Sequence, residues 1–318
     1  MKKWIAITLC CLLLAGCTGP KTASTVTYLD VFDTVTTIIG DADAAAQIHT
    51  QLQRYHKLFD IYNEYEGLNN LKTVNDQAGV APVTVDGEII ELLTDCVEYY
   101  ALTEGRVNVA MGSVLKLWHD AREKSLENPQ QAYIPTAEAL AEAGKHTDIA
   151  CLVIDKENKT VYLTDPEMSL DVGAIAKGWA AQKVAESAPA GMLISLGGNV
   201  VATGPKGEDT PWVVGVQDPK GEEIRKKLSL TKGAIVTSGD YQRTFTVGGK
   251  DYPHIIDPET CMPGMLWSSV TVVCEDSGLA DALSTALFLM PLEEGKALAE
   301  KCGARAVWID KTGKTVSS

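Results

Sequence analysis

Two short segments of the sequence combine residue types that bind charged ligands. The first spans 170–178 (LDVGAIAKG), where an expected strand ends at Asp171 and small residues lead to Lys177 at the start of an expected helix. Small residues let a ligand approach the backbone closely, and a helix N-terminus beside a lysine favours an anion. The spacing of a Walker motif is absent. The segment indicates an anion-binding turn, although a plain strand-to-helix turn with a solvent-exposed lysine fits the same residues.

The second segment, 280–287, is expected to lie in a helix whose N-cap is Ser277. Asp281 and Thr285 are four residues apart, so their oxygens share one helix face. A carboxylate and a hydroxyl on one face suit Mg²⁺, which prefers hard oxygen ligands and retains waters or substrate phosphates. A polar stripe on an amphipathic helix is the alternative interpretation.

Three further segments are polar but less specific. Residues 237–241 (TSGDY) are typical of a turn, and His254 precedes an apolar pair and an Asx-Pro turn, although a single histidine is more often structural than catalytic. Residues 195–199 run into a Gly-Gly turn, which allows close backbone approach or a simple reversal of the chain. Tyr62 lies in a polar and aromatic loop to which the residues alone give no role.

These segments need elements that position them, and the hydrophobic pattern predicts an α+β fold. No regular βα alternation is present, so we expect a mixed, largely antiparallel sheet with flanking helices rather than a doubly wound fold. Helices are expected at 43–59, 87–103, 114–124, 135–143, 175–186, 279–290 and 292–302. Residues 26–39 are expected to form a strand, or a hairpin interrupted near Asp33. Further strands are expected at 151–154, 160–163, 168–172, 192–196, 212–216, 234–237, 270–273 and 306–309, with a hairpin over 241–252.

The first sixteen residues have the composition of a targeting signal. Lys2 and Lys3 precede an apolar run at 5–14 that is too short to span a membrane comfortably, and the sequence LAG before Cys17 resembles a lipoprotein cleavage box. We expect a signal peptide at 1–16, lipidation at Cys17, a tether at 17–25 and a single domain at 26–318. An ordinary secretory signal with a chance cysteine is the alternative.

The formal net charge of −14 limits the partners. Nucleic-acid binding needs clustered Lys and Arg, so no nucleic-acid partner is expected. Binding to an anionic membrane through charge is disfavoured as well, which leaves the lipid as the anchor. An acidic protein that binds a polyanion needs a divalent cation or an anion-binding helix terminus. The cysteines after Cys17 are odd in number and show no CxxC spacing, so neither a disulfide framework nor a zinc site is expected.

Taken together, these segments resemble the ApbE family of FAD:protein FMN transferases. The resemblance extends from about Tyr28 to Asp310 and rests on the order and spacing of residues 31–34, 170–178, 195–199, 212–219, 234–241, 254–258 and 280–285. The D-x-G-x-I-A-K-G segment, the pair T-S-G-D-Y and H-I-I-D-P, and the A-D-A-x-x-T helix are jointly specific. The lipoprotein signal is also common in that family.

The resemblance implies roles for individual residues. Mg²⁺ would be held by the backbone carbonyl of Ala174 and the side chains of Asp281 and Thr285, with Ser284 as a neighbour. His254 occupies the position of a histidine proposed to activate the acceptor hydroxyl. The FAD contacts would come from Phe32, Tyr62, Arg106, Val107, Asn108, Asp171, Lys177 and Ile256.

Two segments depart from the family pattern. Phe32-Asp33-Thr34 replaces the usual Met-Gly-Thr, and Val107-Asn108 replaces the usual Phe-Asp pair. The second change removes a carboxylate from an FAD contact, whereas the residues assigned to the metal are intact.

The implied activity is Mg²⁺-dependent transfer of FMN from FAD to a threonine or serine hydroxyl of an acceptor protein, with release of AMP. The fold would have two lobes with the FAD site between them. The implied acceptors are flavin-carrying subunits of membrane redox complexes, and the implied location is the outer face of a bacterial cell membrane or inner membrane. Two other functions fit the same residues: an Mg²⁺-dependent FAD pyrophosphatase that gives FMN and AMP, and a flavin-binding lipoprotein without catalysis.

Overall fold

The computed structural model describes residues 23–221, 223–241 and 243–318. The expected signal peptide, Cys17 and most of the expected tether lie outside these residues. The end of the expected tether is already part of the fold, because Ser24 and Thr25 pair with Gly40 and Ile39. Within the described residues, no helix has both the length and the apolar character needed to cross a membrane.

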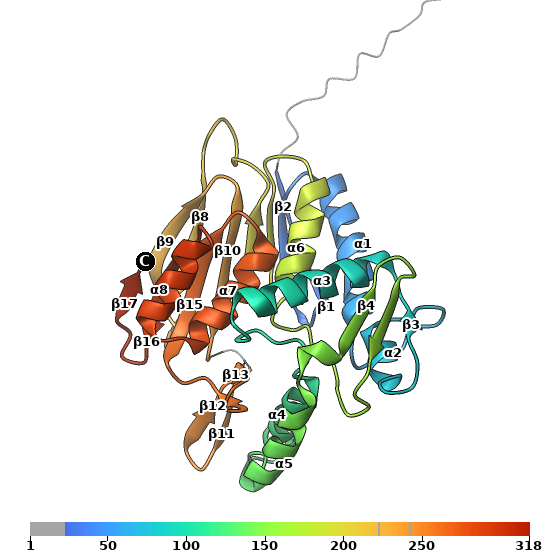
Figure 1. Ribbon diagram of the computed structural model, residues 1–318. Coiled ribbons are helices and arrows are strands. Elements are labelled where there is room, and N and C mark those ends of the chain that lie inside the picture. Colours follow the sequence, from blue (N-terminus) through green and yellow to red (C-terminus); the bar gives the residue numbers. More distant parts are fainter. Residues whose placement is uncertain (1–22, 222, 242) are drawn as a thin grey trace, which may run out of the picture.

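An eight-stranded sheet forms the centre of the larger lobe (Figure 1), in the order β1-β2-β6-β7-β10-β15-β16-β17. Every neighbouring pair is antiparallel. The strands are rich in Val, Ile and Thr, which fit a pleated surface that is buried on at least one face. Their bounds are β1 Ser24–Val31, β2 Thr34–Gly40, β6 Leu193–Leu196, β7 Asn199–Ala202, β10 Gly233–Gly239, β15 Trp267–Cys274, β16 Arg305–Asp310 and β17 Thr315–Ser317.

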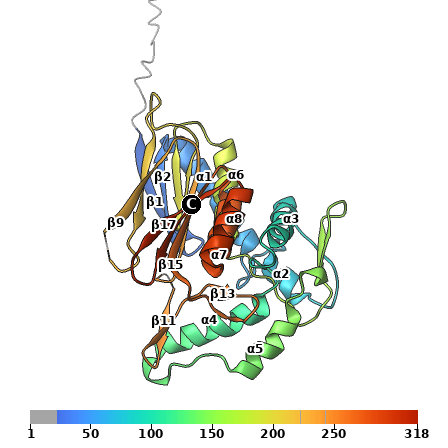
Figure 2. The same ribbon diagram turned by 60° about the vertical axis from the view of Figure 1, so that its left-hand side comes forward.

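Helices cover one face of this sheet, and a hairpin covers part of the other. The helices are α1 Ala42–Phe59, α6 Ala176–Ser187, α7 Ser277–Leu289 and α8 Leu292–Lys301, and Figure 2 shows α6, α7 and α8 on the same side of the sheet. α7 packs against α6, β10 and β15, and eleven of its thirteen residues are buried. A helix enclosed on nearly all sides can bury a polar group on its surface. On the other face, the hairpin of β8 (Trp212–Gln217) and β9 (Ile224–Leu230) packs on Ala202 and Ile235.

The smaller lobe comes from the chain between α1 and α6 and from a later excursion between β10 and β15. Its helices are α2 Leu71–Asp76, α3 Gly87–Leu102, α4 Gly112–Glu127 and α5 Ala137–Ala143, with short 3₁₀ turns at Pro129–Gln131, Gly144–His146 and Ile149–Cys151. Its strands are β3 Val83–Thr84, β4 Leu152–Asp155 and β5 Thr160–Leu163, together with the pairs β11 Phe245–Val247 with β12 Lys250–Tyr252 and β13 Ile256–Asp257 with β14 Met262–Pro263. Trp118 of α4 packs against Phe245 and Tyr252, which joins the two parts.

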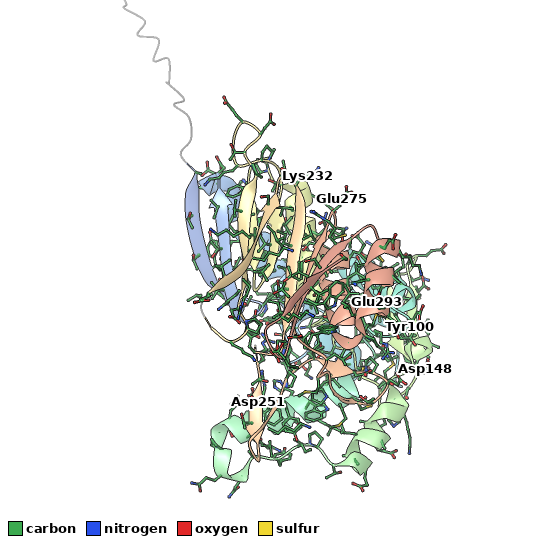
Figure 3. The ribbon with its side chains drawn as sticks, turned by 90° about the vertical axis from the view of Figure 1, so that its left-hand side faces the viewer. Tyr100, Asp148, Lys232, Asp251, Glu275 and Glu293 are labelled. Carbon is green, nitrogen blue, oxygen red and sulfur yellow. The ribbon has the colours of Figure 1, made fainter. Side chains whose placement is uncertain are left out.

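The two ends of the large sheet have different neighbours. β1 starts at Ser24, at the end where β10 begins and β15 finishes. Figure 3 shows Lys232 and Glu275 at this end and Asp251, on the β11–β12 hairpin, at the opposite end. The turn between β1 and β2 also lies at the end that faces the smaller lobe. The chain therefore joins the sheet at one end, and the smaller lobe lies at the other.

The expected α+β class, with a largely antiparallel sheet and flanking helices, is confirmed. The strand expected at 168–172 is wrong, because its one pairing in the described part of the chain is an isolated bridge between Met111 and Ser169. The backbone N–H and carbonyl of Leu170 instead bond to the side chain of Asn75. The expected N-cap Ser277 is also wrong. Asp276 caps α7 by accepting a hydrogen bond from Leu279 N at 2.7 Å.

Candidate functional site

A cavity of about 420 Å³ lies between the two lobes, within the size range of small-molecule sites. It is lined by eleven of the twelve residues to which the sequence assigned a catalytic, flavin or metal role. These eleven are Tyr62, Arg106, Val107, Asn108, Asp171, Ala174, Lys177, His254, Ile256, Asp281 and Thr285. The fold thus brings together segments that are far apart in the sequence.

The turn at 171–177 forms one wall and is held by its own polar groups. Asp171 Oδ1 accepts a hydrogen bond from Gly173 N at 2.8 Å, and Asp171 N donates to Val109 O at 2.8 Å. Lys177 Nζ donates to Gly173 O at 3.0 Å, so the lysine folds back over the turn. Burial raises the pKa of Asp171, while the Gly173 N–H and nearby positive side chains oppose that rise. This wall therefore holds a carboxylate and an ammonium group at the start of α6.

A glycine at position 178 lets α6 and α7 approach closely. Gly178 N donates to Asp281 Oδ2 at 2.8 Å, and a Cβ at 178 would lie 2.4 Å from both Asp281 Cβ and Ser277 O. Lys177 Nζ lies 3.9 Å from Asp281 Oδ2. Asp281 is 4% exposed, and burial raises its pKa although Lys177 and the Gly178 N–H favour the charged form. The late carboxylate thus meets the lysine of the early turn.

The residues assigned to Mg²⁺ fit a site that a ligand completes. Within the described residues there is no cluster of three His, Cys, Asp or Glu side chains that could hold a metal ion. Asp281 Oδ1 makes no hydrogen bond to any described residue. Thr285 Oγ1 lies 3.5 Å from Ser238 Oγ, which is 2.7 Å from Ser284 Oγ. One carboxylate, one hydroxyl and the carbonyl of Ala174 are hard oxygen donors, and Mg²⁺ commonly adds waters and substrate phosphates to such a set.

Tyr62 also lines the cavity, from a loop that Asp60 organises. The Asp60 carboxylate accepts hydrogen bonds from Tyr62 N at 2.7 Å, Asn63 N at 3.1 Å, Asn63 Nδ2 at 2.9 Å and Tyr65 OH at 2.7 Å. Burial alone would raise the pKa of Asp60, but the hydrogen bonds lower it overall. The Tyr62 ring centroid is 5.3 Å from that of His119, and 56% of the Tyr62 surface is exposed. Partial desolvation is the first cause, and the charge of Asp171 the second, that raise the Tyr62 pKa to about 12. Tyr62 therefore presents a neutral aromatic ring.

Phe32 is the assigned residue that is not among those lining the cavity. Phe32 and Asp33 form the two-residue turn between β1 and β2, with φ angles of 53° and 49°. The Phe32 ring packs against His56 and Phe59, at centroid distances of 5.8 and 6.5 Å, and its N–H donates to His56 Nδ1 at 3.2 Å. Asp33 and Thr34 line the cavity instead. The turn reverses the chain within two residues, so adjacent side chains point to different sides.

Asn108 lines the cavity, but its amide is already engaged. Nδ2 donates to Thr147 O at 2.8 Å, and Oδ1 accepts from Ala110 N at 2.9 Å. A carboxylate at this position could not donate to the Thr147 carbonyl. The departure from the usual acidic residue therefore has a local physical reason: the side chain at 108 fixes the loop that carries it.

The β13 segment closes the cavity beside Arg106. Arg106 Nη1 lies 3.5 Å from Asp257 Oδ1 and 3.2 Å from Glu259 Oε2, which ties the loop of the smaller lobe to this segment. Ile256 is buried, whereas His254 is exposed at the cavity. A histidine that reaches both the cavity and solvent can exchange protons with an incoming group.

Several lining residues were not predicted from the sequence. One face of α4 lines the cavity through Leu115, Trp118, His119 and Arg122. Their spacing of three and four residues is a helical stripe, which is a signal that the sequence contains. Asn199 and Arg243 also line the cavity, and Asn199 lies in the Gly-Gly segment that had no assigned role. Asp240 of the TSGDY segment faces elsewhere and pairs with Lys311 at 2.7 Å.

Comparisons with known proteins agree with this geometry. The sequence pattern of the ApbE family matches residues 22–308. The FAD:protein FMN transferase of Treponema pallidum (strain Nichols) is 34% identical over 278 residues, which is 80% of this chain and 75% of that protein. The FAD:protein FMN transferase of Vibrio cholerae is 28% identical over 329 residues, covering 98% of this chain and 95% of that protein. The crystal structure of the ApbE protein of Thermotoga maritima superposes with a TM-score of 0.82 and 30% identity, covering 93% of this chain and 97% of that one. The chain therefore belongs to the ApbE family.

Proposed function

We propose that this protein is an Mg²⁺-dependent transferase that moves FMN from FAD to a threonine or serine hydroxyl of an acceptor protein and releases AMP. One observation carries the proposal: the turn with Lys177 and the helix with Asp281 meet in a single cavity, with 3.9 Å between Nζ and Oδ2. The names of the relatives from Treponema pallidum and Vibrio cholerae support the same reaction.

The charges at this junction suit a diphosphate. Lys177 and the N-terminal end of α6 would bind its oxygens, since a lysine and unpaired backbone N–H groups both favour anions. Ala174, Asp281 and Thr285 would hold Mg²⁺, which when bound offsets the negative charge that develops on the diphosphate as the bond to AMP breaks. Burial disfavours the charged form of Asp281, and a cation beside it would favour that form.

His254 would remove the proton from the acceptor hydroxyl. The hydroxyl oxygen forms a bond to the phosphorus of the FMN half, the bond from that phosphorus to the bridging oxygen breaks, and AMP leaves with the bridging oxygen. The exposure of His254 allows a protein side chain to reach it. Tyr62, a neutral aromatic side chain at the cavity, would pack against a ring of the dinucleotide.

The location and partners belong to the same proposal. A lipid on Cys17 would anchor the enzyme to the outer face of a bacterial membrane, where flavin-carrying subunits of redox complexes would be its acceptors. The targeting signal in the sequence supports this location, and the net charge of −14 argues against nucleic acid. A Cys17→Ala variant tests the anchor, because we expect it to move from the membrane fraction to the soluble fraction.

The reaction is tested by incubating the mature protein with FAD, Mg²⁺ and a candidate acceptor subunit, and by measuring covalent FMN on the acceptor by intact mass. We expect labelling that chelation of Mg²⁺ abolishes. Asp281→Asn should reduce the rate at least 100-fold while the melting temperature is kept, since an amide is a weaker cation ligand. Asp276→Asn on the same helix is the matched control, because asparagine is as good an N-cap as aspartate.

The same assay separates the alternative functions. Free FMN and AMP without a labelled acceptor would identify a pyrophosphatase. Tight binding of FAD with no turnover would identify a flavin-binding protein without catalysis. Equal activity of Asp281→Asn and the wild type would remove the metal site from the proposal.

A further inference from the structure

One residue that lines the cavity has a buried side-chain atom without a hydrogen-bond partner. In the described part of the chain, six buried side-chain nitrogen or oxygen atoms are unpaired, and only one of them belongs to a residue that lines the cavity. It is Oδ1 of Asn199, whose residue is 1% exposed. An unpaired buried acceptor is costly, so a native structure that keeps one in a cavity calls for a ligand or a water at that point.

The orientation of this amide is fixed by the backbone. Asn199 Nδ2 donates to Leu196 O at 3.2 Å across the Gly-Gly turn. If the amide were turned over, its oxygen would face the carbonyl oxygen of Leu196 instead. The atom left without a partner is therefore an acceptor, and its complement must be an N–H or O–H donor.

The position of Asn199 relates it to the proposed metal residues. Asn199 pairs with Val236 of β10, and Ser238 lies two residues further on the same face of the sheet. Ser238 Oγ contacts the hydroxyls of Ser284 and Thr285. Neighbouring strands are about 4.8 Å apart and two residues rise about 6.7 Å, so the side chains of Asn199 and Ser238 are separated by about 8 Å.

We infer that Asn199 Oδ1 accepts a hydrogen bond from a sugar hydroxyl that flanks the diphosphate of the bound dinucleotide. This inference rests on the proposed function and adds to it a specificity-determining residue. The sugars of a dinucleotide are bonded directly to its diphosphate, and both the ribityl chain and the ribose carry O–H donors that lie beside a diphosphate held near Lys177 and Thr285. An uncharged amide oxygen accepts from such a donor without repelling the phosphate, as a carboxylate would.

The test uses Asn199→Leu, which keeps the side-chain volume and removes the acceptor. We expect the melting temperature of the ligand-free protein to stay within about 2 °C of the wild type, because the variant loses one long hydrogen bond and also an unpaired acceptor. We expect the affinity for FAD, measured by calorimetry, to fall about tenfold, because the ligand hydroxyl is then buried without a partner.

Asn70→Leu is the matched control. Asn70 is fully buried, and its amide bonds to Lys57 O, Asn63 O and Thr73 N. Its loss should lower the melting temperature of the ligand-free protein by several degrees, which is the behaviour of a structural asparagine. A fall of the same size in Asn199→Leu would overturn the inference.

Titrations with FMN and with AMP identify the sugar. A weaker affinity for FMN alone assigns the ribityl chain, and a weaker affinity for AMP alone assigns the ribose. If Asn199→Leu binds FAD, FMN and AMP within twofold of the wild type, the acceptor faces only water and the inference is overturned. If the wild-type protein itself does not bind FAD, the proposed function fails as well, so the two failures are distinguishable.

Discussion

The two walls of the cavity are built in different ways. The turn wall, residues 171–178 with α7, fixes its charges through backbone hydrogen bonds and through the close approach that Gly178 allows. The loop wall consists of residues 60–65, the cavity-lining face of α4 and Arg243. It presents an aromatic ring and cationic side chains, and it is held by the Asp60 carboxylate and by contacts between side chains. Phosphoryl transfer tolerates little displacement of its charges, whereas recognition of a ring system tolerates more. We therefore expect changes in the turn wall to cost more than changes in the loop wall.

The largest effect is expected from Gly178→Ala. The new Cβ would lie 2.4 Å from a backbone oxygen and from Asp281 Cβ, neither of which can move without separating α6 from α7. We expect a loss of about 3 kcal/mol in the free energy of unfolding, measured by urea denaturation. Gly87→Ala is the control, since nothing lies within 4 Å of a Cβ there, and it should be neutral or stabilising by up to about 1 kcal/mol. Equal behaviour of the two variants would contradict the close packing.

Asp60→Asn should come next. The amide keeps fewer acceptor sites and loses the charge, so we expect about 2–3 kcal/mol of destabilisation at pH 7 and a raised KM for FAD as Tyr62 is displaced. The folded-state pKa of Asp60 is lowered. The contribution of the Asp60 charge to the free energy of unfolding is therefore fully present above the pKa of about 3.9 that an aspartate has in the unfolded chain. It is lost as the pH falls through the lower pKa of Asp60 in the folded protein.

Urea titrations at several pH values test this assignment. The difference between the wild type and Asp60→Asn should shrink below about pH 4. Tyr65→Phe removes one of the four hydrogen bonds and should cost only about 1 kcal/mol. A difference that does not change with pH would show that the charge of Asp60 has no part in holding the loop.

Asn108→Asp should have a moderate effect on stability. The carboxylate loses the hydrogen bond to Thr147 O and faces that carbonyl oxygen, so we expect a cost of about 1–2 kcal/mol in the free energy of unfolding at pH 7. The affinity for FAD should fall only to the extent that the substitution displaces the loop that carries residue 108. An unchanged stability together with tighter FAD binding would mean that the side chain at 108 serves the ligand rather than the loop.

The smallest effect is expected from His119→Ala on the loop wall. The imidazole contacts Tyr62 with 5.3 Å between ring centroids, a contact worth about 0.5–1.5 kcal/mol. We expect the affinity for FAD to fall about threefold, with the melting temperature almost unchanged, as measured by calorimetry and thermal unfolding. A loss of activity as large as that of Asp281→Asn would reverse the comparison between the two walls.

The turn wall was predictable because its signals are local. The lysine, the small residues and the carboxylate at 170–178 are contiguous, and the spacing of Asp281 and Thr285 places them on one helix face whatever surrounds the helix. That Gly178 is the point where the two helices meet did not follow from the pattern, because it depends on residues more than one hundred positions apart.

Other parts of the site and of the fold were less predictable because distant partners determine them. The amide of Asn108 bonds to Thr147, 39 residues away. The backbone of Leu170 bonds to the side chain of Asn75, so these bonds take the place of the hydrogen bonds to a neighbouring strand that the expected strand would have made. Asp276 rather than Ser277 is the N-cap because α7 begins at Ser277, a boundary that the sequence pattern does not fix to within one residue. Phe32 was assigned by position in a motif, yet a tight turn directs its ring to the core.

The orientation of the large sheet limits the distance between the cavity and the membrane to which the proposed lipid would attach. β1 begins at Ser24, and Asp33, just beyond its other end, lines the cavity. The eight residues of this strand span about 26 Å. If Cys17 carries the proposed lipid, the seven peptide links to Ser24 add at most about 25 Å. The reactive hydroxyl would then be met some 25–50 Å above the bilayer, which selects acceptors that display their threonine or serine on a protruding domain rather than at the lipid surface.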